Sequence, residues 1–265
     1  MSEQPLDFRS RVRNGEHLVG IFIKTPAEQP IEILGGLGFD FVVIDAEHAP
    51  FDRVTIDRAM LAAKAAGIAA LVRLHSGSGP DILSTLDSGA HGILVPHVTS
   101  ADRARDIVSA CRYKGGRRGF SNSPRAGHYG RRGLTEHIEF SDRNVTVVMQ
   151  IEDPEALDEI DAIASVDGVD ALFVGRGDLA VAMGASSVET PEVIDATRRI
   201  AAAAKGAGKA LSVFSAQTAD GSAMAQLGAT LFVAGSDQFY MTQAAREALA
   251  GFRELGSTAL KRSAN

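Results

Sequence analysis

Short apolar or β-branched runs recur along the whole chain and alternate with stretches of helical pattern. Eight such runs are present, at 17–23, 41–44, 69–74, 92–96, 145–151, 170–175, 210–214 and 229–235. Most are continuous rather than alternating in polarity, as expected for strands that are covered on both faces of a parallel sheet. The helical stretches between them include 52–67, 100–113 and 191–208. This alternation predicts a single (β/α)8 barrel, an α/β fold, as one domain over residues 1–265.

An open, doubly wound parallel sheet is the alternative fold. It is not favoured, because no G-x-G-x-x-G motif follows the first run. The chain is 45% hydrophobic and 23% charged, which is enough apolar material for one sizeable core. No linker or low-complexity segment divides it.

Charge and cysteine content exclude several classes of protein. The net charge of −6 argues against a nucleic-acid binder. The single cysteine, Cys111, excludes an intrachain disulfide framework and fits a reducing compartment. Residues 1–15 lack the apolar stretch of a secretory signal, and no run is long enough to span a bilayer. We therefore expect a soluble, cytoplasmic protein that contacts neither membrane nor nucleic acid.

The segment I-D-A-E-H-A-P, residues 44–50, departs from the pattern of a buried strand. It places Asp45, Glu47 and His48 within four residues at the end of an apolar run. Burying unpaired ionisable groups is costly, so a core has no use for them. Barrel active sites lie at the C-terminal ends of the strands, which is where these residues fall.

Other polar residues follow the other predicted strands. They are Lys24, Arg73, His75, His97, Gln150, Glu152, Asp153 and Asp178. Ionisable side chains are therefore predicted to converge from several strands on one end of the barrel. A purely structural barrel would not require this.

Glu152 and Asp178 follow neighbouring strands, where two carboxylates repel each other unless a cation lies between them. Two oxygen ligands with room for water and a chelating substrate are typical of Mg²⁺ or Mn²⁺. The segment G-R-G-D, 175–178, also offers backbone N–H groups at a helix start, which suit a carboxylate. The structural alternative is that Glu152 is a salt-bridged rim residue and Asp178 a helix N-cap.

Several segments together resemble one enzyme family. They are F-D-F-V-V-I-D-A-E-H-A-P-F-D, L-V-R-L, R-Y-K-G-G-R-R-G-F, Q-I-E-D-P-E-A-L and V-G-R-G-D-L-A. In this order they resemble the metal-dependent (class II) pyruvate aldolases of the 4-hydroxy-2-oxoheptanedioate or 2-oxo-3-deoxy acid aldolase type, over nearly the whole chain. The resemblance implies a carbon–carbon lyase that cleaves 4-hydroxy-2-oxo acids to pyruvate, or hydroxypyruvate, and an aldehyde.

The resemblance also implies roles for individual residues. Glu152 and Asp178 match the metal ligands, for Mg²⁺, Mn²⁺ or Co²⁺, and Arg73 and His48 match the catalytic pair. Arg73 would stabilise charge on the substrate oxygen, and His48 would move the proton of the C4 hydroxyl. Asp45 and Glu47 would orient His48 and metal-bound water. Arg73, Gln150, Gly177 and Asp178 are the expected substrate-binding residues.

Two structural alternatives accompany these roles. His48 could be an ordinary hydrogen-bonded strand-end histidine, and Arg73 could form a structural salt bridge with Asp45 or Glu152.

Asp87 closes the helix before the fourth predicted strand, at the opposite end of the barrel from His48. In the resembled family, an Asp at the matching place is the partner of the catalytic histidine. The resemblance therefore implies a homo-oligomer, a hexamer, in which Asp87 reaches a neighbouring subunit's site. The alternative is that Asp87 is a helix-end residue bonded to local backbone.

The chain departs from the family in two loops. It has D-A-E-H and G-R-G-D where family members commonly have D-G-E-H and G-P-A-D, so Arg176 is expected to place a flexible cation beside the metal loop. Residues 113–133 form a Gly-rich loop with six Lys and Arg residues. We expect it to cover the site and present Arg118 or Arg125 to an anionic substrate. Subunit contacts and nucleic-acid binding are the alternatives.

Three rival functions remain. A Schiff-base aldolase would need a desolvated lysine at a strand end, and Lys24 is the candidate. An acyl-CoA ester lyase would use related enolate chemistry. A non-catalytic barrel would bind 2-oxo acids without cleaving them.

Overall fold

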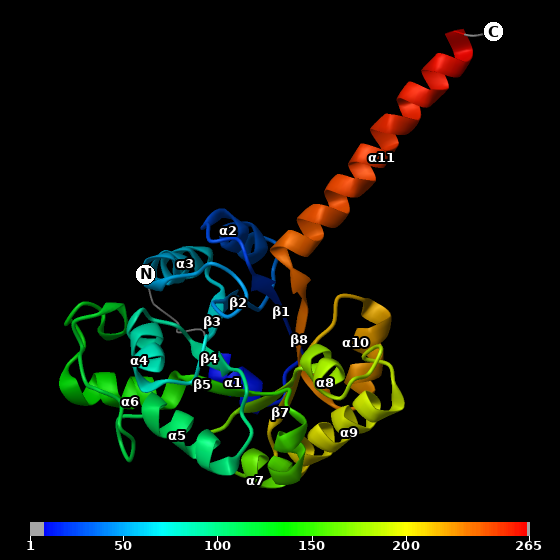
Figure 1. Ribbon diagram of the computed structural model, residues 1–265. Coiled ribbons are helices and arrows are strands. Elements are labelled where there is room, and N and C mark those ends of the chain that lie inside the picture. The colour runs from blue at the N-terminus through cyan, green and yellow to red at the C-terminus, as the bar shows by residue number, and fades with distance from the viewer. Residues whose placement is uncertain (1–7, 264–265) are drawn as a thin grey trace.

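The fold is a closed barrel of eight parallel strands in sequential order, surrounded by helices (Figure 1). The structure is a computed structural model that describes the backbone of residues 8–263 and the side chains of residues 8–255. The predicted (β/α)8 barrel is confirmed. The outer limits of the predicted domain, 1–7 and 264–265, lie outside the described residues.

Each of the eight predicted runs coincides with one strand to within one residue at either end. The strands are β1 Leu18–Ile23, β2 Phe41–Asp45, β3 Ala69–Arg73, β4 Gly92–Val95, β5 Thr146–Ile151, β6 Ala171–Val174, β7 Ala210–Phe214 and β8 Ala229–Ser236. The ring closes where β1 pairs with β8, with Leu18 opposite Leu231.

The helices, with two short 3₁₀ helices, occupy the segments before, between and after the strands. They are α1 Phe8–Arg13, α2 Gln29–Gly36, α3 Arg53–Ala66, α4 Gly79–Asp87, α5 Ala101–Cys111, η1 Arg125–Gly127, α6 Leu134–Asn144, η2 Pro154–Glu159, α7 Ile160–Ala164, α8 Arg176–Ala182, α9 Pro191–Gly206, α10 Thr218–Gln226 and α11 Asp237–Ser263. The local sequence determines where several of these helices begin. In α3, Asp52 and Thr55 form a capping box, which satisfies backbone donors directly after the D-A-E-H turn.

Alternate residues of each strand belong to two separate apolar layers. Val42 and Ile44 pack with the outer helices, whereas Phe41 and Val43 belong to the cluster that fills the barrel. Because side chains alternate along a strand, Asp45 continues the inward-facing series of Phe41 and Val43. The inner face of β2 therefore changes from apolar to charged at its last residue.

Helix α1 closes the opposite, N-terminal end of the barrel. Phe8 and Val12 belong to the interior cluster, and the Phe8 ring lies 5.3 Å from that of Phe41. Beside them, Nε of Arg9 lies 2.9 Å from both carboxylate oxygens of Asp170, in a buried ion pair. Since this end is filled, the open end is the one where the strands finish.

Helix α11 leaves the end of β8 and extends away from the barrel (Figure 1). Large apolar side chains are exposed on it, including Met241, Leu249, Phe252 and Leu255. Within the described part of the chain, no helix has the length and apolar character needed to cross a membrane.

Candidate active site

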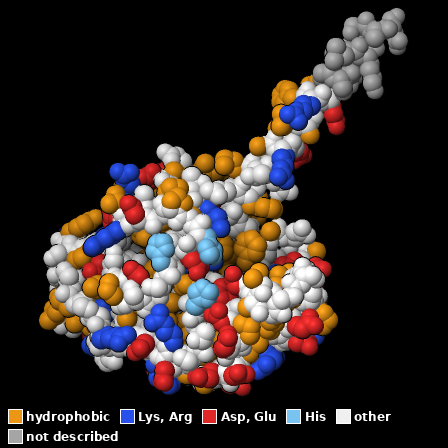
Figure 2. All heavy atoms as spheres, in the orientation of Figure 1, with side chains coloured by type: hydrophobic (Ala, Val, Ile, Leu, Met, Phe, Trp, Pro, Cys, Tyr) orange, Lys and Arg blue, Asp and Glu red, His pale blue; other side chains and the backbone are white. Residues whose placement is uncertain are grey.

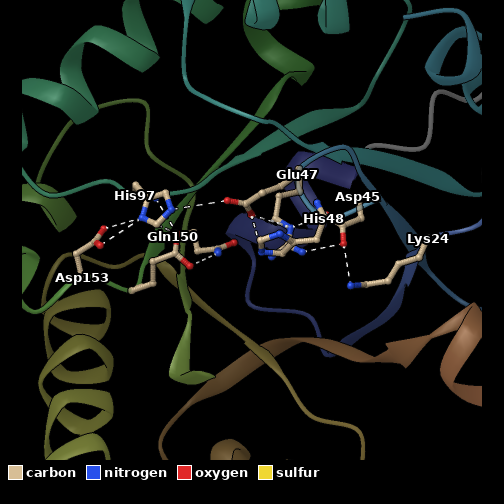
Figure 3. A network of polar contacts seen from close by, with 9 residues as sticks. Lys24, Asp45, Glu47, His48, His97, Gln150 and Asp153 are labelled. Atoms are coloured by element: carbon tan, nitrogen blue, oxygen red, sulfur yellow. Dashed lines mark hydrogen bonds and ion pairs between the residues drawn. The ribbon is translucent and has the colours of Figure 1, made fainter. Parts of the chain in front are cut away.

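Polar side chains from β1 to β5 meet at the C-terminal end of the barrel. Figure 2 shows histidine, acidic and basic side chains gathered around this opening, and Figure 3 shows those that contact one another. We call this group the rim cluster; it comprises Lys24, Asp45, Glu47, His48, Arg73, His97, Gln150, Glu152 and Asp153. Asp45, Arg73 and Gln150 come from strand positions that continue the inward-facing series of Val43, Leu71 and Val148.

Asp45 and Arg73 form a buried bidentate ion pair at the ends of β2 and β3, which are paired in register at these two residues. Nε and Nη2 of Arg73 donate to the two carboxylate oxygens of Asp45 at 2.9 and 2.8 Å. The Asp45 side chain is 0% exposed and that of Arg73 8%. The guanidinium also lies over the Phe22 ring, 4.5 Å from its centroid. These contacts hold the Arg73 guanidinium in one orientation at the bottom of the site.

Two further groups stabilise the Asp45 carboxylate. Lys24 Nζ lies 3.2 Å from Oδ2, and the backbone N–H of His48 donates to Oδ1 at 3.1 Å. Burial alone would raise the pKa of Asp45, but the hydrogen bonds and charge of Arg73, with the His48 N–H and Lys24, outweigh it and lower the pKa. Asp45 is therefore a fixed negative charge that holds two cations.

Glu47 lies beside this pair and has incomplete hydrogen bonding. Its buried Oε2 is 3.3 Å from Nε of Arg73 and 3.8 Å from Nε2 of His48, but accepts no hydrogen bond from the described part of the chain. Burial, together with the charge of Glu152, raises the pKa of Glu47, although Arg73 opposes this. His48 itself is exposed at the opening. Glu47 therefore lies beside His48, and the role of Glu47 in orienting His48 stays a prediction.

Glu152 follows β5 and is 2% exposed. Its Oε1 accepts from the backbone N–H of His97 at 2.9 Å, and its Oε2 accepts from the Gln150 amide. The buried Oε1 of Gln150 has no hydrogen-bond partner among the residues that the structure describes. Gly175 is packed so closely on Glu152 that an added Cβ would lie 2.6 Å from its Cβ, so the start of α8 adjoins this carboxylate.

His97 follows β4 and faces the carboxylates of Glu47 and Asp153 (Figure 3). Its Nδ1 lies 3.1 Å from Oδ2 of Asp153, and its Nε2 lies 3.8 Å from Oε1 of Glu47. Burial would lower the pKa of His97, but Asp153, Glu152 and Glu47 outweigh it and raise the pKa.

Glu47, His97 and Glu152 form a group that suits a divalent cation. Each offers one ligand atom, and the three atoms lie within 4.8 Å of one another. Two carboxylates and an imidazole are common ligands of divalent metal ions. Oε2 of Glu47 and Oε1 of Gln150 lie beside this group without hydrogen bonds from the described residues. A bound cation, or a water molecule on it, would give these oxygens a partner.

Asp178 and Gly177, both predicted from the G-R-G-D segment, are exposed in the first turn of α8. Asp178 is not part of the Glu47–His97–Glu152 group. It stands three residues after Gly175 and makes no side-chain hydrogen bond or ion pair with the residues that the structure describes. Asp178 thus follows shortly after Gly175, the residue that packs against Glu152, but the two carboxylates are not paired.

The expectation that Arg176 is a flexible cation is wrong. Its two terminal nitrogens lie 2.7 and 2.6 Å from the carboxylate oxygens of Asp220 in α10, and Nη2 also donates to the Phe214 carbonyl. Because its side chain is 11% exposed, this cation is held in place rather than offered to a ligand.

Residues 113–133 do not cover the rim cluster of their own chain, contrary to expectation. The loop lies between α5 and α6, and its arginines contact the outer helices. Arg118, whose side chain is 1% exposed, pairs with Asp87 at 2.9 Å, and Arg125 pairs with Asp57 at 2.9 Å. A loop that joins two helices on the outside of the barrel cannot reach the opening from this position.

Asp87 ends α4, before the N-terminal end of β4, and so lies away from the rim cluster. It borders a surface cavity of about 450 Å³ whose lining includes Arg53, Asp57, Arg125 and Tyr129. Its ion pair with Arg118 also shows that its side chain has a partner within its own chain.

Comparison with known proteins identifies the family. The HpcH/HpaI aldolase/citrate lyase family matches residues 18–244. The chain belongs to this family. The resemblance inferred from the sequence is thereby confirmed, and the chain is an enzyme of an aldolase family.

Relatives within the HpcH/HpaI family include two proteins named 5-keto-4-deoxy-D-glucarate aldolase. The one from Enterobacter sp. (strain 638) is 35% identical over 235 residues, which are 88% of this chain and 91% of the relative. The one from Salmonella arizonae is 37% identical over 208 residues, 78% of this chain and 80% of the relative. Family membership supports metal-dependent carbon–carbon lyase activity.

Solved structures agree with the family assignment. An HpcH/HpaI aldolase/citrate lyase family protein from Burkholderia cenocepacia J2315 superposes with a TM-score of 0.89 at 29% identity, covering 94% of this chain and all of that one. Citrate synthase SbnG superposes with a TM-score of 0.87 at 29% identity, covering 96% of this chain and 100% of that one.

His97 is the residue whose contribution the sequence did not reveal. Its place after a predicted strand was apparent, but a histidine at a strand end has many ordinary explanations. The signal that could have identified it is its neighbourhood: it follows the strand next to the one that carries Glu152 and Asp153.

We predict that Asp45→Asn destabilises the fold. The substitution leaves the buried Arg73 guanidinium without its charge partner, which costs about 3 kcal/mol of unfolding free energy. Because the folded pKa of Asp45 is lowered, its contribution is complete above the ordinary value of 3.8 and is lost as the pH falls below it. Urea unfolding of both proteins from pH 7 to pH 3 measures this difference.

Asp102→Asn is the control for this prediction, because Asp102 pairs with Arg105 on the exposed face of α5 and should matter little. Equal stability of wild type and Asp45→Asn at pH 7 would contradict a stabilising role. A difference in unfolding free energy that stays constant from pH 7 to pH 3 would also contradict this role.

Proposed function

We propose that this HpcH/HpaI family enzyme catalyses reversible, divalent-metal-dependent aldol cleavage of 4-hydroxy-2-oxo acids. The products would be pyruvate, or hydroxypyruvate, and an aldehyde. The observation that carries the proposal is the rim cluster, in which a fixed Arg73, an exposed His48 and a group of metal-compatible side chains lie together. The relatives named as aldolases support it.

The metal ion in this proposal is Mg²⁺, Mn²⁺ or Co²⁺, held by Glu152 and Asp178. Glu152 is supported by its place among metal-compatible groups, and Asp178 by its unpaired carboxylate on the turn that begins beside Glu152. When bound, such an ion supplies Lewis-acid stabilisation for the negative charge that develops on the substrate's keto oxygen.

Arg73 supplies a fixed positive charge to the same region. Asp45 engages its Nε and Nη2, and Nη1 has no hydrogen-bond partner among the described residues. The proposed role of Nη1 is to donate to the substrate's carbonyl oxygen. The ion pair with Asp45 keeps the guanidinium oriented before substrate arrives, which is how a preorganised charge lowers a barrier.

His48 is proposed to carry the proton of the C4 hydroxyl, directly or through water. An exposed imidazole at the opening can exchange protons near neutral pH. Its backbone is tied to Asp45 and its ring faces Glu47, so these two carboxylates orient it.

Gln150 and the first turn of α8 are the proposed substrate-binding groups. The unpartnered Oε1 of Gln150 can accept a hydrogen bond from a substrate hydroxyl. Gly177 has open space where a Cβ would be, so a substrate carboxylate can approach its backbone N–H and that of Asp178.

A second candidate function is lysis or formation of an acyl-CoA ester. The likeness to a structure described as citrate synthase SbnG favours keeping it. An assay with thioester substrates separates it from the aldolase proposal.

A Schiff-base mechanism at Lys24 is less favoured, because its Nζ is paired with Asp45; borohydride trapping with pyruvate would reveal it. A barrel that binds 2-oxo acids without cleaving them would release no aldehyde.

We predict metal-dependent release of pyruvate from 4-hydroxy-2-oxo acids. A coupled assay would use a panel that includes 5-keto-4-deoxy-D-glucarate, the compound in the relatives' names. Exhaustive chelation should abolish cleavage, and added Mg²⁺, Mn²⁺ or Co²⁺ should restore it. Full activity after chelation, or no cleavage of any panel member by metal-loaded protein, would refute the proposal.

We also propose that the protein is a homo-oligomer, a hexamer, whose subunits share active sites. Two surfaces support this: α11 extends from the barrel with exposed apolar side chains, and Asp87 borders a cavity on the outer helices. Exposed apolar patches of this kind are typical of subunit contacts. In this arrangement Asp87 acts at the site of a neighbouring subunit.

The remaining expectations belong to the same proposal. The partners are small 2-oxo acids and aldehydes, with no nucleic acid and no membrane, and the enzyme works in the cytoplasm. Burial raises the pKa of the Cys111 thiol to about 12, which suits a cysteine that stays reduced.

We predict that mixing two inactive variants restores activity. His48→Ala and Asp87→Ala proteins would be unfolded together and refolded, and random assembly should give both intact residues to about a quarter of the sites. The matched control is His48→Ala mixed with Arg73→Ala, which should stay inactive because both residues belong to the same subunit's site. No recovery in the first mixture, or a fully active monomer, would contradict shared sites.

A further inference from the structure

We propose that His97 is a third protein ligand of the divalent cation, through its Nε2 atom. We infer that this nitrogen makes the centre favour Mn²⁺ or Co²⁺ over Mg²⁺. The inference rests on the proposed function, because it concerns the same metal site. Family membership does not give His97 a role in metal binding. The residue follows β4, and no residue of β4 or its loop has a role in the proposed function above.

The backbone at His97 turns this residue toward Glu152. His97 has a φ of 54°, in the left-handed region that non-glycine residues seldom adopt. In this conformation its N–H donates to Oε1 of Glu152 at 2.9 Å, and its Nδ1 lies 3.5 Å from the same oxygen. The residue therefore both orients Glu152 and stands beside it.

Asp153 lies beside one ring nitrogen of His97 and leaves the other facing Glu47. Nδ1 lies 3.1 and 3.3 Å from the two carboxylate oxygens of Asp153, and Nε2 lies 3.8 Å from Oε1 of Glu47. In the proposed centre Asp153 holds the Nδ1 proton, and the lone pair of Nε2 faces the ion. A carboxylate that holds the far nitrogen of an imidazole is the usual second partner of a metal-bound histidine.

The distances around Nε2 fit a shared cation. Two atoms that each lie about 2.1 Å from one ion can be at most about 4.2 Å apart. Nε2 of His97 is 3.8 Å from Oε1 of Glu47, which is within this limit and too long for a hydrogen bond. One ligand atom each of Glu47, His97 and Glu152 lie within 4.8 Å of one another, so two carboxylates and one imidazole border the same space.

The type of donor decides which ion is favoured. Mg²⁺ prefers oxygen ligands and usually keeps several waters, whereas imidazole nitrogen binds first-row transition metals. A centre with two carboxylates and one imidazole should therefore discriminate against Mg²⁺ more strongly than a centre of carboxylates alone.

Pulsed EPR of the Mn²⁺-loaded protein tests the proposal directly. A nitrogen ligand gives a ¹⁴N coupling on Mn²⁺, and we expect this coupling in the wild type. His97→Asn should lose it. Asparagine tolerates a positive φ, so the backbone at position 97 and the N–H bond to Glu152 should persist. His75→Asn, which removes an exposed histidine after β3, is the matched control and should keep the coupling.

Affinity measurements provide a second readout. Removing a ligand of this kind should weaken Mn²⁺ binding by about 10- to 100-fold. Mg²⁺ affinity, measured by competition, should fall much less, so the preference for Mn²⁺ should shrink by a similar factor. Absence of a ¹⁴N coupling in the wild type, its persistence in His97→Asn, or equal losses of Mn²⁺ and Mg²⁺ affinity would overturn the assignment.

Failure of this inference can be distinguished from failure of the proposed function. A metal-dependent aldolase without the ¹⁴N coupling would contradict the His97 assignment alone. A protein that shows the coupling but cleaves no 4-hydroxy-2-oxo acid would contradict the aldolase proposal alone.

Discussion

The site depends on a buried pair of opposite charges at the point where the barrel interior meets water. Asp45 and Arg73 lie on adjacent strands in register, and each would be costly to bury without the other. The inward-facing side chains of β2 and β3 are otherwise apolar. The bidentate contact between Asp45 and Arg73 allows each of these strands to end in a buried charged residue. Lys24, His48 and Glu47 are arranged around this pair, so the geometry of the opening depends on it.

The pair also separates the structural and chemical parts of the barrel. Toward the N-terminal end, the interior contains apolar side chains and is closed by Phe8 and Val12 of α1. Toward the C-terminal end, carboxylates, imidazoles and a guanidinium replace them. Because charges are screened less in such a partly enclosed space than in water, a fixed cation and a bound metal ion act there with greater effect.

The strands and the composition of the rim cluster could be predicted from the sequence because both depend on local pattern. Continuous apolar runs identified the strands, and a position at or just after the end of a run identified Asp45, Glu47, His48, Arg73 and Glu152. Contacts between distant segments could not be predicted. Arg176 is held by Asp220, 44 residues away, and Arg118 by Asp87, 31 residues away. The left-handed backbone that turns His97 toward Glu152 also leaves no local signature, because histidine rarely adopts it.

The central claim is that this opening activates a 2-oxo acid by stabilising negative charge on its oxygen, whichever aldehyde is used. Exchange of the C3 protons of pyruvate with deuterated solvent, followed by NMR, measures this step without an aldehyde. The account predicts loss of the methyl proton signal with metal-loaded protein, no loss after chelation, and recovery when Mn²⁺ is returned. Unchanged pyruvate after prolonged incubation with metal-loaded protein would contradict it.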